Sequence, residues 1–343
     1  AVLYRNAINI SRTNTSILYY QWENYANYTN TFGKHNLNVM LGTSFSDRET
    51  IIVTGSGDAV IKDTPLFWDL NYLSPSAVKG VSGGYTLSRQ LSYYGRVNYG
   101  YDNTWLLSAS LRRDAGDSSI LPPGNRWGIF PAFSVGYVIS NQPFFPKNTP
   151  ITFAKLRASW GQNGNTGPLS GWSYRQTISS SSYYSWDNDI AYQVASAPTT
   201  LNNPDLKWET SEQLDFGIDL RAFNGRLSFT ADYFHKETKD LLVYIIPAFE
   251  TGISSTPYNA GNVLNEGLEF ELGWQGKAGD FSYGISANLA TLHNKVTYLD
   301  PSLTRVSGAT FHTSTVTYFE TGYPVWYMRG YKMTDIDDAT GNP

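Results

Sequence analysis

Two glutamates that lie two residues apart are the first candidates for chemistry. Glu269 and Glu271 alternate with apolar residues, so an extended strand would carry both carboxylates on one face. Paired carboxylates are the catalytic groups of most glycosidases. The same alternation is also typical of two solvated charges on the polar face of an amphipathic strand. We favour the second interpretation, and we expect no enzyme activity.

Other catalytic and metal-binding patterns are not found in the sequence. The four histidines have no ligand spacing, there is no cysteine, and neither a nucleophile elbow nor a P-loop occurs. We therefore expect no cofactor. An acidic group near the end of the chain, Asp335, Asp337 and Asp338, supplies the oxygen ligands that calcium prefers, but it lacks the spacing of an EF-hand loop. It is a weak metal candidate, and the alternative is a solvated loop.

An aromatic-rich segment between residues 161 and 204 is the most suggestive binding feature. Its rings stand among serines, glycines and asparagines. Flat rings stack on sugars, short polar side chains bond hydroxyl groups, and the same mixture makes adaptable protein contacts. Substrate contact, contact with a partner lid and ordinary loop packing therefore all remain open for the aromatic candidates: Trp172, Tyr174, Tyr183, Tyr184, Trp186 and Tyr192.

The elements that would position these residues are long amphipathic strands. From Leu214 to Leu220, apolar residues alternate with Asp215, Gly217 and Asp219, and the alternation resumes at Phe229 after a turn at 223–225. This is the pattern of a β-hairpin. Each arm exceeds the five or six residues of an ordinary strand. The sequence predicts about ten such strands.

The connectors between these strands alternate in length. Those near residues 31, 102, 145, 224 and 278 are short, whereas those at 50–85, 114–125, 162–206, 240–262 and from 296 onward are mostly long and rich in Gly, Ser, Pro and Asn. A sheet with short turns at one end, long loops at the other and one apolar face is typical of an outer-membrane β-barrel. A soluble β-helix or carbohydrate-binding sandwich is the alternative, but it would not explain the alternating connectors.

Composition supports a membrane strand protein and excludes other classes. Charged residues make up only 16% of the chain and aromatic residues 15%, against about 25% charged residues in soluble domains. No apolar run approaches the length of a spanning helix. The net charge of −4 argues against nucleic-acid binding. In a barrel, outer-membrane lipid would cover the apolar face and the charges would face the lumen: Arg96, Asp215, Asp219, Asp232, Glu269 and Glu271.

Several stretches resemble, in order and spacing, the SusC/RagA family of TonB-dependent outer-membrane transporters. The resemblance covers roughly residues 10 to 335. It is carried by "LLSASLRRDAGDSS", "RWGIFPAFSVGYVISNQPFF", "KLRASWGQNGN", "NPDLKWETSEQLDFGIDL", "RLSFTADYFHKETKDLL", "NAGNVLNEGLEFEL", "NLATLHNKVTYL" and "GYPVWYMRGYKMTDID". The resemblance implies an all-β, antiparallel transmembrane barrel of 22 strands in the bacterial outer membrane.

The resemblance also implies a function and partners. Such a barrel imports oligosaccharides or peptides actively, is energised through TonB and works beneath a SusD-like surface lipoprotein. Residues 1–343 are expected to form part of a single barrel domain, with the plug domain and TonB box outside this chain. Gly267 is expected where a side chain would crowd that plug. The alternative functions are a passive porin or a surface adhesive barrel.

Overall fold

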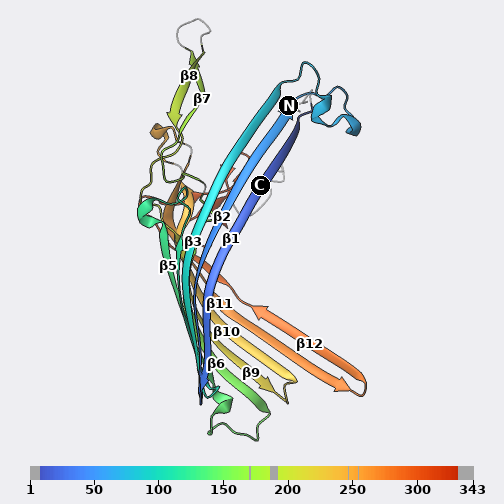
Figure 1. The fold of residues 1–343 in the computed structure, drawn as a ribbon, viewed down its shortest axis with the longest axis vertical. Helices are drawn as coiled ribbons and strands as arrows, with labels where there is room; N and C mark the ends of the chain where they lie inside the picture. Colours follow the sequence, from blue (N-terminus) through green and yellow to red (C-terminus); the bar gives the residue numbers. More distant parts are fainter. Residues whose placement is uncertain (1–7, 170, 186–191, 246, 254, 331–343) are drawn as a thin grey trace, which may run out of the picture. The chain divides into compact units, whose positions relative to one another are not determined.

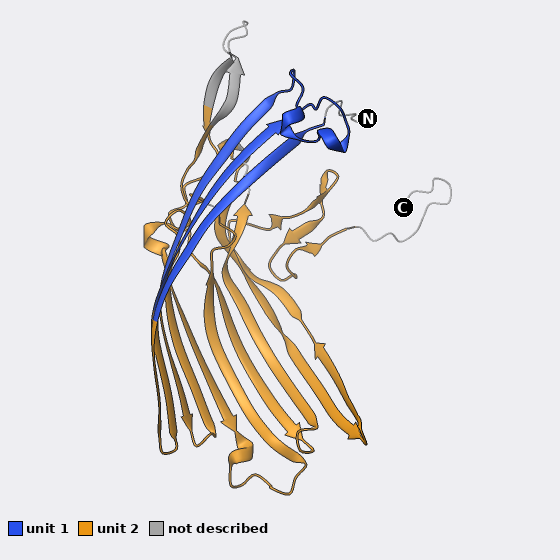
Figure 2. Ribbon diagram, turned by 45° about the vertical axis from the view of Figure 1, so that its right-hand side comes forward, with its two compact units in different colours: residues 1–24, 43–92 blue, residues 25–42, 93–343 orange. Residues whose placement is uncertain are grey.

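The structure is a computed structural model that describes residues 8–169, 171–185, 192–245, 247–253 and 255–330. The chain divides into two compact units, one of residues 1–24 and 43–92 and one of residues 25–42 and 93–343 (Figure 2). The first three strands contribute residues to both units. The second unit contains most of the sheet and all of the cavities described below.

The fold is all-β, as predicted, and its main element is an antiparallel sheet of 11 strands (Figure 1). The pairing order follows the chain as an open path from β1 to β12, and β13 pairs with β11. The ten strands of ten or more residues confirm the predicted number. The strands of this sheet are β1 (Ile10–Phe32), β2 (His35–Gly57), β3 (Lys79–Tyr101), β4 (Trp105–Ala115), β5 (Trp127–Val138), β6 (Ile151–Asn165), β9 (Glu209–Ala222), β10 (Leu227–Ile245), β11 (Thr256–Ala278), β12 (Phe281–Ala290) and β13 (His293–Leu299).

Smaller elements lie in the connectors. Single turns of 3-10 helix are η1 (Pro65–Phe67), η2 (Leu70–Tyr72), η3 (Pro123–Asn125), η4 (Ile139–Asn141) and η5 (Phe249–Thr251). One hairpin is formed by β7 (Ile178–Ser185) and β8 (Tyr192–Pro198), and another by β15 (Thr310–Phe311) and β16 (Ser314–Thr315). A three-stranded sheet contains β14 (Val306–Ser307), β17 (Thr317–Phe319) and β18 (Tyr327–Met328).

The predicted hairpin turns are confirmed by their backbone angles. Asp102 and Asn103 have φ of 52° and 49°, and Phe223 and Asn224 have φ of 53° and 58°, followed by Gly225 at 82°. Positive φ at the central residues matches the twist of the flanking strands, which is why Asn, Asp and Gly are favoured there. In the second unit these tight turns lie at one end of the sheet (Figure 2), but the prediction of a short connector near residue 145 at that end is wrong, because residues 139–150 separate β5 from β6 there.

Two predicted loops were too long. β2 and β3 leave a connector of residues 58–78 rather than 50–85, and β10 and β11 leave 246–255 rather than 240–262. Polar and glycine residues suggested a loop after Asp240, but the ladder continues through a bulge between Thr238 and Leu241. Asp240 takes φ of 55° there, and Asn259 Nδ2 donates to its carbonyl oxygen at 2.8 Å. A bulge absorbs extra residues without ending the strand.

The register shows that the sheet of the second unit has one polar and one apolar face. Across β9 and β10, Asp219 is opposite Thr230, whereas Ile218 is opposite Ala231 on the other face. The apolar face is open: Phe216 is 50% exposed and Leu272 48%. Apolar surface this extensive requires a nonaqueous cover, and lipid supplies one in outer-membrane barrels.

β12 and β13 are one strand interrupted at Thr291 and Leu292. Glu269 of β11 is opposite Ala290, and Glu266 of β11 is opposite His293. A Cβ placed on Gly267 would overlap the carbonyl oxygen of Thr291 and would lie 2.9 Å from Cζ of Phe234. Within the chain the crowding at Gly267 therefore comes from the strand junction itself, and the expectation that a side chain there would also crowd the plug stays a prediction.

The loop end of the second unit contains two hydrophobic clusters. One is centred on Ala260, Val296 and Phe319, each with no exposed surface, and joins β11 and β13 to the small three-stranded sheet. The other joins Leu121 and Leu206, also fully buried, to Leu242. These connectors are therefore packed structures with cores of their own.

Candidate functional site

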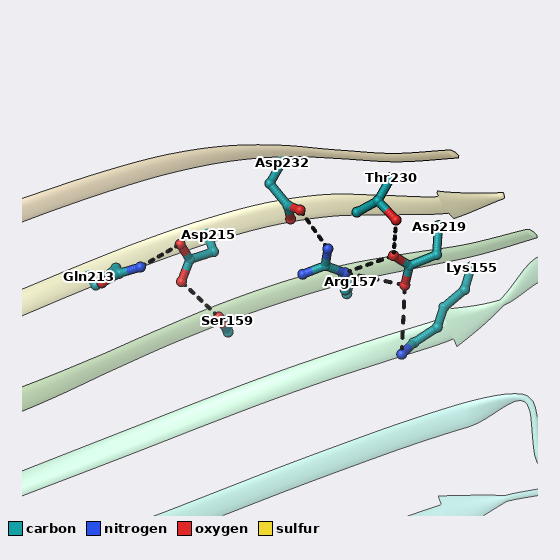
Figure 3. Close-up of polar contacts among 8 residues, drawn as sticks. All are labelled: Lys155, Arg157, Ser159, Gln213, Asp215, Asp219, Thr230 and Asp232. Carbon is teal, nitrogen blue, oxygen red and sulfur yellow. Dashed lines mark hydrogen bonds and ion pairs between the residues drawn. The ribbon is translucent and has the colours of Figure 1, made fainter. Parts of the chain in front are cut away.

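A charged network crosses three strands on the polar face of the second unit (Figure 3). Arg157 of β6 donates from Nη2 to Asp232 of β10 at 2.6 Å and from Nε to Asp219 of β9 at 3.2 Å. Lys155 Nζ lies 4.0 Å from Asp219, and Thr230 is within 3.5 Å of the same carboxylate. The network thus pairs two basic with two acidic side chains.

Arg157 reaches β10 because β9 has a glycine in its path. Its guanidinium lies across Gly217, where an added Cβ would be 2.7 Å from Arg157 Cζ and would overlap Asp232 Oδ1. Gly217 is the partner of Arg157 on one side and of Asp232 on the other. An arginine side chain can therefore connect two strands that do not pair with each other.

A row of short polar side chains continues from this network toward β1. Asp215 accepts from Ser159 at 3.1 Å and from Gln213 at 2.8 Å. In the neighbouring strands, Ser108 donates to Asn98 at 2.7 Å. The row continues through Asn98 to Asn38 at 3.4 Å and from Asn38 to Thr29 at 2.8 Å. Except for Gln213, these side chains line a depression of about 640 Å³, together with Gly136 and Gly217.

The structure brings together three of the six predicted lumen-facing residues and places the others on the same face. Asp215, Asp219 and Asp232 belong to the row and the network. Glu269 is opposite Asp232 and Glu271 is opposite Thr230, both exposed. Arg96 is exposed and lies on the face of Asn98, two residues away on β3. That these side chains face a lumen stays a prediction.

The sequence reasoning missed the basic partners in this network. Lys155, Arg157 and Ser159 alternate with Leu156, Ala158 and Trp160, so the same period of two placed them on the polar face. Their partners could not be read from the sequence, because the register between β6 and β9 pairs residues about sixty positions apart.

The predicted aromatic loop residues have different surroundings. Trp172 is 46% exposed, has φ of 65° and stacks with the Arg175 guanidinium at 4.6 Å. Tyr174 is only 5% exposed, packs in the cluster with Leu121 and donates to the Ser118 carbonyl at 3.2 Å. Tyr183 and Tyr184 belong to β7 and Tyr192 to β8. Trp186 lies outside the described residues, as do Asp335, Asp337 and Asp338.

The described residues contain neither a metal-ligand cluster nor a membrane-spanning helix. No three His, Cys, Asp or Glu side chains among them are placed to hold a metal ion. Among the same residues, no helix has the length and apolar character that crossing a membrane requires.

The curated proteins that this chain resembles are TonB-dependent receptors. The TonB-dependent receptor P3 of Formosa agariphila is 31% identical over 281 residues, which are 81% of this chain and 27% of that protein. The TonB-dependent receptor SusC of Bacteroides thetaiotaomicron is 30% identical over 217 residues, 62% of this chain and 21% of that protein. The chain thus spans about a quarter of the length of these curated relatives.

Solved structures agree on the fold. The RagAB peptide importer in its "closed-closed" state has a TM-score of 0.76 and 23% identity, covering 97% of this chain and 37% of that one. The outer membrane transporter YddB from Escherichia coli has a TM-score of 0.55 and 10% identity, covering 83% of this chain and 34% of that one. At these identities the likeness shows the fold alone.

The family match extends over almost the whole chain. Residues 3–343 match the family described as TonB dependent receptor-like, beta-barrel. This match, the two-faced antiparallel sheet and the RagAB-like fold agree with one another. The chain therefore belongs to the TonB-dependent receptor β-barrel family, whose members are outer-membrane proteins.

Proposed function

We propose that the protein carrying this chain imports oligosaccharides or peptides actively across the outer membrane, as the barrel component of a complex with a SusD-like surface lipoprotein, energised through TonB. The family match over residues 3–343 supports this most directly. SusC among the relatives and RagAB among the fold neighbours support a nutrient-uptake complex.

In this proposal the polar face lines the lumen. Arg96, Asp215, Asp219, Asp232, Glu269 and Glu271 then contact water or whatever fills the barrel. The ion pairs of Arg157 support this orientation, because charged side chains are expensive on a lipid face. The exposed side chains of Phe216 and Leu272 on the other face would meet lipid acyl chains.

The orientation can be tested with single cysteines, since the chain has none of its own. Asp219→Cys and Ile218→Cys are adjacent residues on opposite faces of β9. Outer membranes containing the full-length protein are permeabilised by mild osmotic shock without detergent. A membrane-impermeant, water-soluble maleimide should then label Asp219→Cys faster than Ile218→Cys. Equal labelling of the two, or preferential labelling of Ile218→Cys, would contradict the proposed faces.

Transport is tested in the producing cells. Uptake of labelled oligosaccharides and peptides should fall when the gene is deleted, and it should fall equally when TonB is removed or the proton gradient is collapsed. A passive porin would lose uptake on gene deletion alone. An adhesive barrel would show no uptake difference in any of these cells.

Among the aromatic loop residues, we propose Trp172 as a contact with the substrate or with the SusD-like lipoprotein. Its ring is exposed, whereas that of Tyr174 is covered by its own cluster. Left-handed backbone angles at a bulky residue occur preferentially at ligand sites. Loss of uptake, or loss of lipoprotein binding, in Trp172→Ala would tell the two contacts apart.

A further inference from the structure

A second cavity lies at the loop end of the second unit. Its volume is about 660 Å³, and β10, β11 and residues 325–326 contribute to its walls. Two of its lining residues, Asn265 and Asn294, are opposite each other on β11 and β13. They lie on the polar face of the sheet, because Asn265 is also opposite Lys236 of β10. None of its lining residues was singled out in the sequence.

Trp326 forms one wall of this cavity in a strained conformation. Its φ is 54°, although it is a bulky residue, and its side chain is 41% exposed. The indole rests on Gly308, where an added Cβ would lie 2.7 Å from Trp326 Cε3, and its ring is 5.7 Å from the fully buried Phe319. The glycine and the buried ring hold the indole in place, so the strain is maintained by the surrounding structure.

Asn294 fixes the segment that carries Trp326. Its Oδ1 accepts from the Val325 backbone N–H at 2.7 Å, and its Nδ2 donates to Asn265 Oδ1 at 2.6 Å. The amide nitrogen of Asn265 and the hydroxyl of Thr238 then have no hydrogen-bond partner in the described part of the chain. Both belong to the cavity wall and are available to a ligand.

The charge of the cavity selects against anions. Glu209 is the one charged residue among the described lining residues, and it is buried. Its carboxylate already accepts from Asn165 Nδ2 at 3.1 Å and from the Leu242 N–H at 3.2 Å. Among the lining residues that the structure describes there is no lysine or arginine. A ligand therefore gains from ring stacking and neutral hydrogen bonds, and an anion would be repelled.

We propose that this cavity binds a neutral sugar ring of an oligosaccharide. The exposed part of the Trp326 indole covers the apolar C–H face of the ring, and Tyr244 provides a second aromatic wall. The Asn265 amide and the Thr238 hydroxyl bond to sugar hydroxyl groups. A mostly apolar cavity with a few fixed polar groups is the usual form of a small-ligand site. The proposal rests on the proposed import function and chooses between its two substrate classes.

The test uses the full-length protein purified in detergent, with binding followed by calorimetry. The probes are neutral hexasaccharides of glucose (α- and β-linked), mannose and xylose, together with hexagalacturonate and a neutral hexapeptide. We expect at least one neutral hexasaccharide to bind, and Trp326→Leu and Asn265→Ala each to weaken that binding by about tenfold or more, or 1.4 kcal/mol. Trp326→Tyr should keep most of the affinity.

The matched control is Trp68→Leu, because Trp68 is 50% exposed in a different loop and has no role in the cavity. Its affinity should equal that of the unchanged protein. Folding of every variant is checked by the heat-dependent gel mobility of barrels, because Asn265→Ala also removes the acceptor of Asn294 Nδ2, and Asn294 holds the strained segment. The proposal is overturned if only the peptide or hexagalacturonate binds, if no hexasaccharide binds at millimolar concentration, or if Trp326→Leu and Asn265→Ala bind as well as the control.

Absence of sugar binding in this cavity and absence of active import would give different results. Uptake that depends on TonB but is unaffected by the cavity variants rejects the cavity alone. Uptake of the bound sugar that persists without TonB rejects active import, whatever the cavity binds.

Discussion

Gly217→Ala should destabilise the barrel, although alanine is normally the better residue in a strand. The added methyl group would occupy the space in which the Arg157 guanidinium passes over β9, 2.7 Å from its Cζ. Arg157 must then move away from Asp232, whose Oδ1 already has no hydrogen-bond partner among the described residues. One carboxylate on the polar face would lose its ion pair.

The expected magnitude follows from the burial of the pair. Breaking a fully buried ion pair costs about 3–5 kcal/mol, and an exposed pair contributes about 0–1 kcal/mol. The side chains of Arg157 and Asp232 are 35% and 19% exposed, so solvent screening places the cost at about 1–3 kcal/mol. Replacing a strand glycine should by itself stabilise by about 0.5–1 kcal/mol, and the net effect is therefore a loss centred on about 1 kcal/mol, within a range of about 0–2.5 kcal/mol.

The assay is urea unfolding of the full-length protein in lipid vesicles, in a double-mutant cycle with Arg157→Ala. Once the guanidinium is absent, the Asp232 carboxylate that the added Cβ would overlap is released from its ion pair and can turn away, so Gly217→Ala should lose most of its cost. Gly284→Ala is the matched control, because a Cβ there meets only the Trp274 carbonyl oxygen, at 3.8 Å. The reasoning is refuted if Gly217→Ala is as stable as the unchanged protein, or if its cost persists without Arg157.

Three further changes test the faces, the strand junction and a loop turn. Ile218→Arg, at the middle of the apolar residues of β9, should cost about 2–4 kcal/mol of unfolding free energy in vesicles. Gly267→Ala should separate β13 from β11, because its methyl group meets the Thr291 carbonyl, and should speed hydrogen exchange over residues 293–299. The Ser302 hydroxyl and N–H donate to Asp300 and lower its pKa. That stabilisation is present above the ordinary value of about 4 and is lost as the pH falls through the lowered pKa, so Ser302→Ala should weaken the turn at neutral pH and reduce its acid sensitivity.

Each of these has a comparison that can contradict it. Thr230→Arg, on the polar face beside Asp219, should cost much less than Ile218→Arg, and similar costs would reject the assignment of faces. Exchange over 293–299 that is as slow in Gly267→Ala as in Gly284→Ala would show that the junction has room. The turn is followed by exchange of the Leu303 N–H, which donates to the Asp300 carbonyl at 2.8 Å, and equal acid sensitivity with and without the Ser302 hydroxyl would reject its role.

The amino-acid sequence by itself determined the strands, their two faces and their turns. A period of two extends through Leu214, Phe216 and Ile218, and positive-φ residues such as Asn224 and Gly225 end the strand in a hairpin. These are local properties, fixed by backbone sterics and by the solvent that each face meets. The order of the family motifs along the chain likewise indicated the family.

The tertiary structure alone decided which side chains meet. Arg157 contacts Asp232 through the register of three strands, and β10 continues past Asp240 through a bulge in which Asn259 donates to the Asp240 carbonyl. The cavity beside Trp326 combines β10, β11 and a segment some sixty residues further along the chain. Contacts over such separations depend on pairing and on packed loop cores, and these are set by the free energy of the whole fold rather than by any local pattern.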